Sequence, residues 1–244
     1  MIIYDSDLKT FYSTLISDNN YVSGFGTKDL GDARYVENIV NYFSGSYISY
    51  KKIVTLEQIH SVNIAVFTPL VTDQLEKINE TDGVITKESQ TILTVKTGDC
   101  IPIVFVDKKN KVIGISHQGW RGSVKRMAQK MIERMIEAGS LKKEIVVAIG
   151  PSIGDCCYNI EEDRYYSFLE EFDGYSAKIF HRRGGKLHLN LPLLNYLLLI
   201  EAGIEKKNID FFPFCTRCDK HRFFSFRRDK KQDYGEMISF VMKG

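Results

Sequence analysis

The sequence predicts an α+β fold with mixed sheets in a single domain. Predicted strands come in groups, with helices between the groups and no strict alternation, which argues against a doubly wound parallel sheet. Apolar residues make up 43% of the 244 residues, enough for a large core. No Pro-, Gly- or Ser-rich linker and no internal repeat interrupts residues 1–244, so one domain is expected.

The N-terminal part, residues 1–52, is the least regular, with a strand expected at 22–27 and a short helix at 37–43. From residue 53 onward, apolar runs bounded by turn residues predict strands. The first run is expected to deliver His60 at its end and to pair with the second. These runs are 53–59, 63–68, 81–86, 91–107 with a break at Gly98, and 111–116.

The clearest helix is predicted over 124–138, where apolar residues follow the i, i+3, i+4, i+7 spacing of one buried face. Ser123 is a suitable N-cap, Gly139 a suitable stop, and the methionines of this helix are expected in the core. The remaining predictions are a strand at 144–150, a helix at 161–172, a strand at 186–191 and strands at 208–214, 222–228 and 236–242. A further apolar helix is predicted at 191–203, with Pro192 near its start and Gly203 at its stop.

Charge and targeting signals exclude several classes of protein. The 33 basic and 31 acidic residues leave a net charge of +2, which gives no case for nucleic acid or membrane partners. The basic clusters 181–186 and 222–231 are interpreted as solvated surface. No run approaches the ~18 apolar residues of a membrane-spanning helix. The first residues lack a signal-peptide pattern and the cysteine count is five, so we expect reduced thiols and a cytoplasmic location.

Three potential metal ligands, His60, Cys100 and His117, lie at the ends or breaks of successive predicted strands. Adjacent strands bring such distant residues together. A His/Cys/His set suits Zn²⁺, and three protein ligands with an open fourth position are typical of catalytic zinc. From spacing alone, the alternative that each histidine is an ordinary hydrogen-bonded residue stays open.

The residues that follow His117 favour an anion site. Gly119 and Gly122 allow a sharp turn and close backbone approach. Arg121 directly precedes the predicted helix, whose free N–H groups attract phosphate or carboxylate. The ring of Trp120 either stacks on a substrate ring or anchors the turn in the core, and the anchor is the commoner role.

Two polar side chains flank these ligands. If the break at Gly98 lets Asp99 face the pocket, it is a candidate general acid or base; otherwise it supports the ligands or caps the turn. Gln58 lies two residues before His60, on the same face of the predicted strand, where it can position substrate or water.

Four further cysteines form two pairs, Cys156 with Cys157 and Cys215 with Cys218. A structural zinc site is one interpretation, but a vicinal pair is an awkward chelate, so buried thiols are preferred. No P-loop, Rossmann or G-x-S-x-G pattern occurs, which leaves ATP- or NAD-driven chemistry without support.

Six blocks, in this order, resemble laccase-domain, YfiH-like proteins, often labelled polyphenol oxidases and also described as purine nucleoside phosphorylases. The resemblance covers about residues 53–229, and the N-terminal part matches poorly. The blocks are LEQIHS (56–61), TDGVIT (81–86), TGDCIP (97–102), SHQGWRGS (116–123), IGPSIGDCCYNI (149–160) and CTRCDKHRFFSFRRD (215–229).

The resemblance implies a single-domain α/β/β/α-type sandwich with zinc held by His60, Cys100 and His117. It also implies phosphorolysis of adenosine, inosine, guanosine and methylthioadenosine, together with deamination of adenosine. Purine nucleoside and phosphate are then the expected partners of a monomer or small homo-oligomer. Cys100, Asp99 and Arg121 are expected in catalysis, and Gln58, Lys28, Gly119 and Trp120 in substrate binding.

The chain departs from the family pattern at four positions. Gln118 replaces a usual Ala, Asp155 a small residue or Pro, and Asn190 a common Asp. Lys28 stands where an Arg is normal, which keeps the charge but loses a two-pronged grip on phosphate. These changes leave the metal ligands intact and bear on phosphate affinity and substrate preference.

Three other functions use the same residues. A copper polyphenol oxidase is possible at a His₂Cys site, although a multicopper enzyme needs many more imidazoles than this chain's five His offer. A cysteine hydrolase that edits peptidoglycan precursors would use Cys100 with His117 or His60 as base and Asp99 or Gln58 as third member. A zinc-dependent binding module would fill the fourth ligand position and have no turnover.

Overall fold

The protein is described here by a computed structural model that covers residues 1–69, 73–230 and 232–244. Its helices are α1 (Val36–Gly45), α2 (Trp120–Val124), α3 (Met127–Glu137), α4 (Glu162–Phe172), α5 (Ser176–Ile179) and α6 (Leu191–Glu201), with short 3₁₀ turns η1 (Lys28–Leu30), η2 (Lys142–Glu144), η3 (Asp173–Tyr175) and η4 (Lys206–Asn208). Its strands are β1 (Ile2–Asp5), β2 (Thr10–Ser13), β3 (Tyr21–Gly26), β4 (Lys52–Leu56), β5 (Ile64–Phe67), β6 (Leu75–Ile78), β7 (Gly83–Thr86), β8 (Thr91–Thr97), β9 (Ile101–Asp107), β10 (Val112–Gln118), β11 (Ile145–Ile149), β12 (Phe180–Arg183), β13 (Lys186–Leu189), β14 (Ile209–Phe211) and β15 (Met237–Lys243).

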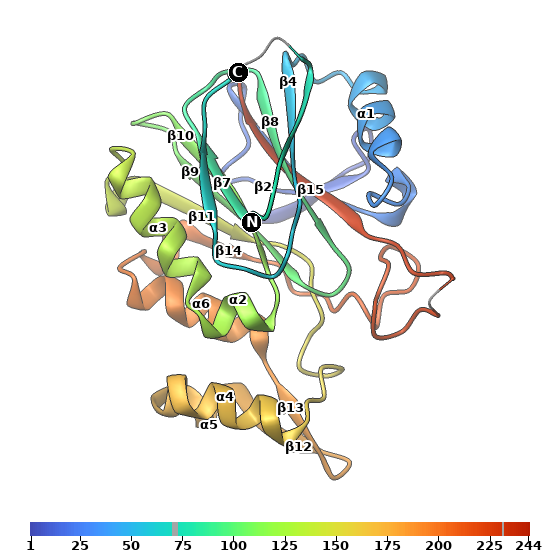
Figure 1. The fold of residues 1–244 in the computed structure, drawn as a ribbon, viewed down its shortest axis with the longest axis vertical. Coiled ribbons are helices and arrows are strands. Elements are labelled where there is room, and N and C mark those ends of the chain that lie inside the picture. The colour runs from blue at the N-terminus through green and yellow to red at the C-terminus, as the bar shows by residue number, and fades with distance from the viewer. Residues whose placement is uncertain (70–72, 231) are drawn as a thin grey trace.

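Two large mixed sheets pack face to face. One has the order β1-β2-β3-β15-β8-β4-β6 and the other β14-β11-β9-β10-β7-β5. Helix α1 covers the outer face of the first sheet, while α3 and α6 cover the outer face of the second (Figure 1). The layers therefore run α/β/β/α, and the predicted α+β sandwich with mixed sheets is confirmed.

Strand β9 shows how the core is built. Val104 and Val106 belong to the apolar layer between the sheets, while Ile103 and Phe105 belong to the layer under α3 and α6. Because successive side chains of a strand point to opposite faces, and both faces are buried here, the sequence reads as one continuous apolar run.

Helix α3 lies close to the second sheet at two strand glycines. A Cβ on Gly83 would lie 2.6 Å from Met127 Cε, and a Cβ on Gly114 would lie 3.1 Å from Met131 Cε. Methionine side chains fill the space that the glycines leave. The predicted core role of Met127, Met131 and Met135 is confirmed, since all three are fully buried.

The predicted pairing of strand 53–59 with 63–68 is wrong. Strand β5 pairs in parallel with β7 in the second sheet, while β4 pairs with β6 and β8 in the first. The strand prediction for 222–228 is also wrong, because this segment forms turns. Its alternating Phe residues favour a strand, but its N–H groups bind side chains instead, as when Ser225 N donates to Asp229 Oδ2 at 2.7 Å.

The helix predicted over 124–138 is divided at Arg126, whose φ of 59° places it in the left-handed region. The short helix α2 therefore precedes α3, and Gly119, not Ser123, is the N-cap of the first. Gly139, with a φ of 96°, does end the second.

Below the sheets, α4, α5 and the β12–β13 hairpin form a smaller lobe that joins the body at α6 (Figure 1). Asn190 caps α6 by accepting a hydrogen bond from Leu193 N at 3.0 Å, so Asn at this position preserves the cap. Among the described residues, every helix is too short or too polar to span a bilayer.

Candidate metal centre

A pocket of about 530 Å³ lies beside the connection from β8 to β9, where the chain crosses from one sheet to the other. The loop after β4, the end of β10 and the start of α2 also line it, through His60, His117 and Trp120 respectively. Much of the remaining wall comes from two distant parts of the chain. The first contributes Ile153, Tyr158 and Arg164, and the second contributes Phe226, Arg227, Tyr234 and Glu236.

The three predicted metal ligands meet in this pocket. The ligand atoms of His60, Cys100 and His117 all lie within 4.8 Å of one another, and Cys100 Sγ is 4.0 Å from His60 Nε2. Donors bound to one tetrahedral zinc stand about 3.3–3.8 Å apart, given bonds of roughly 2.0–2.3 Å. The set is therefore close to the spacing that a single ion requires.

The prediction that His60 ends a strand is wrong. His60 lies in the loop after β4 and has a φ of 60°. A left-handed conformation costs a non-glycine residue on the order of 1–3 kcal/mol and persists only where its surroundings impose it. Here a buried carboxylate imposes it: Asp82 accepts hydrogen bonds from the N–H groups of Ile59, His60 and Ser61 at 3.2, 3.1 and 2.6 Å.

The same carboxylate orients the second imidazole. Asp82 Oδ1 lies 2.8 Å from His117 Nδ1, which leaves Nε2 of His117 free for an ion. Burial opposes the charge on Asp82, but hydrogen bonds from His117 and Ser61 outweigh it and lower its pKa. Asp82 lies in the TDGVIT block but was not predicted as a site residue; its one signal in the sequence is an acidic residue at the entry to a buried strand.

Cys100 and His117 form a polarised pair. Removal from water raises the pKa of the Cys100 thiol, but the charge of His117 and hydrogen bonds from both imidazoles lower it to about 7. Removal from water lowers the pKa of His117, but Cys100 and Asp82 together raise it to about 10. Without a metal ion, the pair is therefore mostly a thiolate beside an imidazolium between about pH 7 and pH 10.

Gly119 is required by the ligands themselves. A Cβ at this position would lie 2.9 Å from His60 Cδ2 and 3.1 Å from Cys100 Sγ. The backbone φ of −79° suits any residue, so the need for glycine is steric. The close approach expected at Gly119 thus brings the backbone against two of the ligand side chains.

Asp99 and Gln58 line the pocket, but their polar atoms are occupied. Asp99 Oδ1 accepts from Thr216 Oγ1 at 2.6 Å, and Oδ2 accepts from Ser225 Oγ and from Arg227 N at 2.9 and 2.8 Å. Burial raises the pKa of Asp99, and these hydrogen bonds oppose the rise. The amide of Gln58 pairs with the main chain of Lys96 at 2.7 and 2.8 Å.

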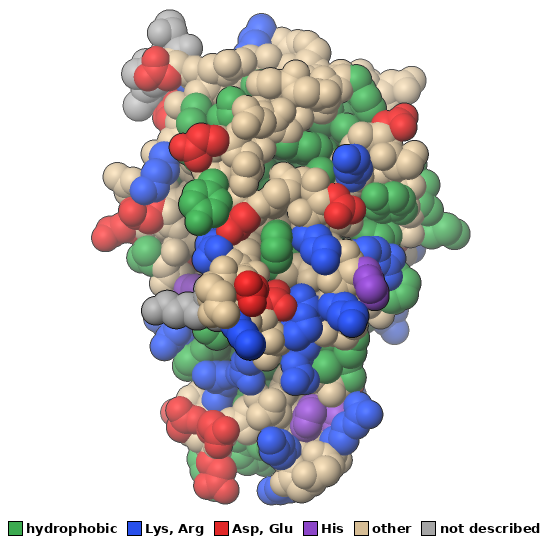
Figure 2. Space-filling model, turned by 90° about the vertical axis from the view of Figure 1, so that its right-hand side faces the viewer, with side chains coloured by type: hydrophobic (Ala, Val, Ile, Leu, Met, Phe, Trp, Pro, Cys, Tyr) green, Lys and Arg blue, Asp and Glu red, His purple; other side chains and the backbone are tan. Residues whose placement is uncertain are grey.

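Arg121 lines the pocket from the first turn of the five-residue α2, and not ahead of the long helix as predicted. Its guanidinium lies 4.7 Å from the ring centre of Trp120, and that of Arg164 lies 4.6 Å from the same ring. Trp120 packs partly against the helix-side core. Arg227 also lines the pocket, and Figure 2 shows Lys and Arg side chains gathered across the lower middle of one face.

Lys28, expected near the anion, does not line this pocket. Its Nζ donates to Lys220 O at 2.9 Å, and its own N–H donates to Arg222 O. Sequence reasoning missed Arg164, which comes from the lower lobe, and placed Arg227 on solvated surface. Neither residue carries a local signal, because the tertiary fold alone brings both to the pocket.

Aromatic side chains complete the wall: Tyr158, Phe226 and Tyr234. Phe226 is 64% exposed, which leaves its ring available to a ligand. It meets Tyr234 edge-on, with ring centres 5.4 Å apart. None of these three rings was predicted to lie at the site.

The prediction that the four remaining cysteines are buried thiols is wrong. Cys156, Cys157 and Cys215 are half-buried, Cys218 is exposed, and the four sulfur atoms lie within 4.8 Å of one another. Adjacent thiols can share one side because 155–157 form a turn and not a strand.

The α/β/β/α sandwich and the His/Cys/His cluster in its basic and aromatic pocket define the class: a mixed α/β protein with a candidate metal centre. The family model for multi-copper polyphenol oxidoreductase laccase matches residues 17–244. The chain therefore belongs to this family, and the resemblance to laccase-domain, YfiH-like proteins is confirmed.

Individual relatives agree with the family. "Adenosine deaminase RL5", from an unknown prokaryotic organism, is 34% identical over 72% of this chain and 70% of its own. "Purine nucleoside phosphorylase LACC1" of Mus musculus is 29% identical over 96% of this chain, which spans 58% of that relative's length. The crystal structure of YlmD from Geobacillus stearothermophilus has a TM-score of 0.85 at 25% identity, with 100% and 99% of the two chains covered.

Proposed function

We propose that this chain is a zinc-dependent purine nucleoside phosphorylase that also deaminates adenosine. The observation that carries the proposal is one pocket in which the His60, Cys100 and His117 cluster faces guanidinium groups and aromatic rings. The names of the relatives, purine nucleoside phosphorylase and adenosine deaminase, support the same two reactions.

The donor set fits zinc, because this ion accepts thiolate and imidazole together. Gly119 supports the fit, since any side chain there would fill the space between His60 and Cys100. When bound, zinc supplies Lewis acidity at the pocket wall. Asp82 contributes by holding the Nδ1 proton of His117 and the loop that carries His60.

Phosphorolysis requires an anion held beside the sugar, and Arg121, Arg164 and Arg227 are suited to hold it. None of the three forms an ion pair with a carboxylate among the residues that the structure describes. The buried Nε of Arg164 also lacks a hydrogen-bond partner within that part of the chain. An unpaired buried donor favours an incoming phosphate oxygen, which a guanidinium can bind through two bonds.

The purine base requires a flat apolar surface, and Phe226 offers one at the pocket mouth. We assign it to stacking on the base and Trp120 to fixing Arg121 and Arg164 through its ring. We assign Gln58 a structural role and not a substrate contact, because its amide hydrogen-bonds to the main chain of β8 and so holds the loop after β4 in place.

Two roles remain for Asp99. Its three hydrogen bonds to the 216–227 segment favour a supporting role that brings Arg227 to the pocket. Its raised pKa favours proton exchange with the substrate. With Asp99→Asn, the supporting role predicts a higher KM for phosphate with an unchanged pH profile of kcat, whereas proton exchange predicts loss of one limb of that profile.

Product analysis tests the proposed function. The purified protein is incubated with adenosine, with and without phosphate. We expect adenine and ribose 1-phosphate only when phosphate is present, and inosine in both samples. Arg121→Ala should suppress base release, and Arg182→Ala, on the exposed β12–β13 hairpin, serves as the matched control. The absence of base release and of inosine in every sample contradicts the proposal.

A cysteine-type hydrolase is a second candidate, because Cys100, His117 and Asp82 form an ordered nucleophile, base and orienting carboxylate. Asp82 takes the place expected for Asp99 or Gln58. Metal removal separates the candidates: a hydrolase keeps or gains amide cleavage after chelation, while the phosphorylase loses base release. Rapid alkylation of Cys100 only in the metal-free protein is expected in both cases.

A multicopper oxidase finds little support in the donors. The chain has five His, and His60 and His117 are the two that the cluster uses. A type 1 copper with a trinuclear centre needs many more imidazoles. A single copper at this site remains a chemical option, with phenol oxidation in the copper-loaded protein as its test.

A further inference from the structure

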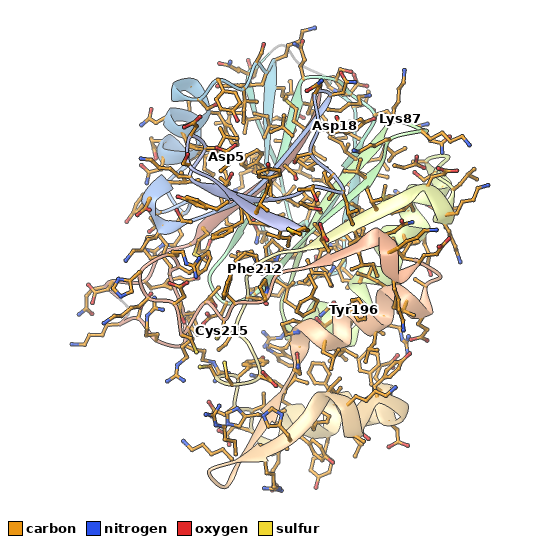
Figure 3. All side chains as sticks on the ribbon, turned by 180° about the vertical axis from the view of Figure 1, so that it is seen from behind. Asp5, Asp18, Lys87, Tyr196, Phe212 and Cys215 are labelled. Atoms are coloured by element: carbon orange, nitrogen blue, oxygen red, sulfur yellow. The ribbon has the colours of Figure 1, made fainter. Side chains whose placement is uncertain are left out.

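The cysteine cluster lies apart from the ligands in the pocket. Figure 3 places Cys215 at the lower edge of the sheets, beyond Phe212, where the chain approaches the smaller lobe. Cys218 Sγ lies 3.4 Å from Cys157 Sγ and 3.6 Å from Cys156 Sγ. Cys215 completes the group, with all four sulfur atoms within 4.8 Å of one another.

The sulfur–sulfur distances distinguish a metal site from a disulfide. A disulfide holds its sulfur atoms about 2.05 Å apart, far closer than Cys218 lies to Cys156 or Cys157 in this cluster. Four thiolates on one tetrahedral zinc, each at about 2.3 Å, stand roughly 3.8 Å apart. The observed 3.4 and 3.6 Å are near the second value.

The backbone around the cluster is arranged as in a metal site. Gly154 N donates to Cys215 Sγ at 3.2 Å, a bond that favours a sulfur carrying negative charge. A Cβ on Gly154 would lie 3.2 Å from Cys215 Cβ and 3.4 Å from Cys156 Sγ, so the backbone at Gly154 packs closely against the cluster. A parallel bridge between Ser152 and Cys215 joins the two segments.

We propose that Cys156, Cys157, Cys215 and Cys218 bind a second zinc ion with a structural role, separate from the pocket. Four protein ligands leave no open position, which is the pattern of structural zinc. The Cys-x-x-Cys turn at 215–218 is a usual half of such a site, and the turn at 155–157 lets the vicinal pair supply the other half.

This ion would link the two segments of the chain that contribute residues between Ile153 and Arg164 and the pair Phe226 and Arg227 to the pocket wall. Ile153 and Tyr158 come from the first segment, and Phe226 and Arg227 from the second. Thr216, beside Cys215, also donates to Asp99. Loss of the second ion should therefore loosen the pocket wall while leaving His60, Cys100 and His117 in place.

Metal content of the full chain, purified under reducing conditions without added zinc, tests the proposal. We expect about two zinc ions per chain in the natural sequence, from one open and one closed site. Cys215→Ser with Cys218→Ser should remove one ion, and Cys100→Ser, the matched control, should remove the other. Retention of full zinc in the double variant, or a Cys157–Cys218 disulfide in the reduced natural protein, overturns the proposal.

Cobalt substitution keeps the test independent of whether the double variant folds. With Co²⁺ in both sites, the natural chain should show the intense visible bands and sulfur-to-cobalt charge transfer of a tetrathiolate site. Cys100→Ser should keep these bands. Their absence in the natural chain, or their loss in Cys100→Ser, contradicts a second metal site whatever the activity of the pocket.

Discussion

At the scale of single residues, Asp82 has the greatest influence on the candidate metal centre. One fully buried carboxylate binds the loop of His60 and the ring of His117, two ligands that lie 57 positions apart in the printed sequence, 117 − 60. It sets the tautomer of one ligand and the backbone of the other. Carboxylates of this kind are as necessary to a site as the ligands that they orient.

Asp82→Asn should lower zinc affinity by about 10–100-fold, because the amide cannot accept from His117 and from the loop together. Competition with a chromophoric chelator measures the affinity. Asp107→Asn is the matched control, since Asp107 is equally buried and also accepts backbone N–H groups, but from Asn110 and Leu141 and not from a metal ligand. Equal losses in both variants would show that burial of a carboxylate, and not orientation of ligands, explains the effect.

Zinc binding at this site should release protons in a pH-dependent manner. Around pH 8, above the Cys100 pKa of about 7 and below the His117 pKa of about 10, the Cys100–His117 pair loses one proton, from His117. As the pH falls below 7, Cys100 is protonated too, so release rises from about one proton toward two and affinity falls more steeply. Calorimetry in buffers of different ionisation enthalpy counts the protons; release that is constant across pH 6 to 8 would contradict the pair.

At the scale of elements, the start of α2 is where structure and site depend on each other. Its N-cap, Gly119, touches two ligands, and its first turn presents Trp120 and Arg121 to the pocket. The break at Arg126 then separates α2 from α3, which packs on the second sheet through Met127 and Met131. The short helix thus couples the metal ligands to the basic wall.

Gly119→Ala should reduce zinc affinity by at least about tenfold, comparable to the loss of an orienting contact. The new Cβ would meet His60 and Cys100, whereas a Cβ on Gly122, in the same helix, meets nothing closer than Ser61 O at 3.5 Å. Gly122→Ala should therefore bind zinc normally. Chelator competition on both variants decides the matter, and normal binding by Gly119→Ala would contradict the steric argument.

The lower lobe contributes to the pocket through α4, which carries Arg164. Arg164→Lys should raise the KM for phosphate by about tenfold with a smaller effect on kcat, because Lys keeps the charge but lacks the planar fork. Arg182→Lys, on the hairpin of the same lobe, is the control. Steady-state kinetics at varied phosphate measures both, and an unchanged KM in Arg164→Lys would remove this residue from the anion group.

At the scale of the whole molecule, local patterns in the sequence predicted the layers better than their pairing. Continuous apolar runs identify β9 and β10 as strands buried on both faces, and the helix periodicity identifies α3. The pairing of β4 and β5 was mispredicted because the chain changes sheet between them, a choice made by distant strands. The 222–228 segment was mispredicted because Asp99 and Asp229 take its N–H groups.

In the site, too, local sequence patterns predicted some residues, while others depend on the tertiary fold. Residue chemistry at the ends of predicted strands was enough to choose His60, Cys100 and His117, which the fold does bring together. Asp82, Arg164 and the aromatic wall could not be chosen, because each is an ordinary residue until the sheets and the lower lobe place it there. Lys28 shows the converse, a charge selected by resemblance that lies outside the pocket.

Anomalous diffraction at the zinc absorption edge, from crystals of the protein grown without chelator, tests the central claim most directly. The claim predicts a peak between the side chains of His60, Cys100 and His117, with no fourth protein atom bound to it. The claim is contradicted if the map shows zinc at full occupancy elsewhere in the crystal and no zinc peak among these three donors.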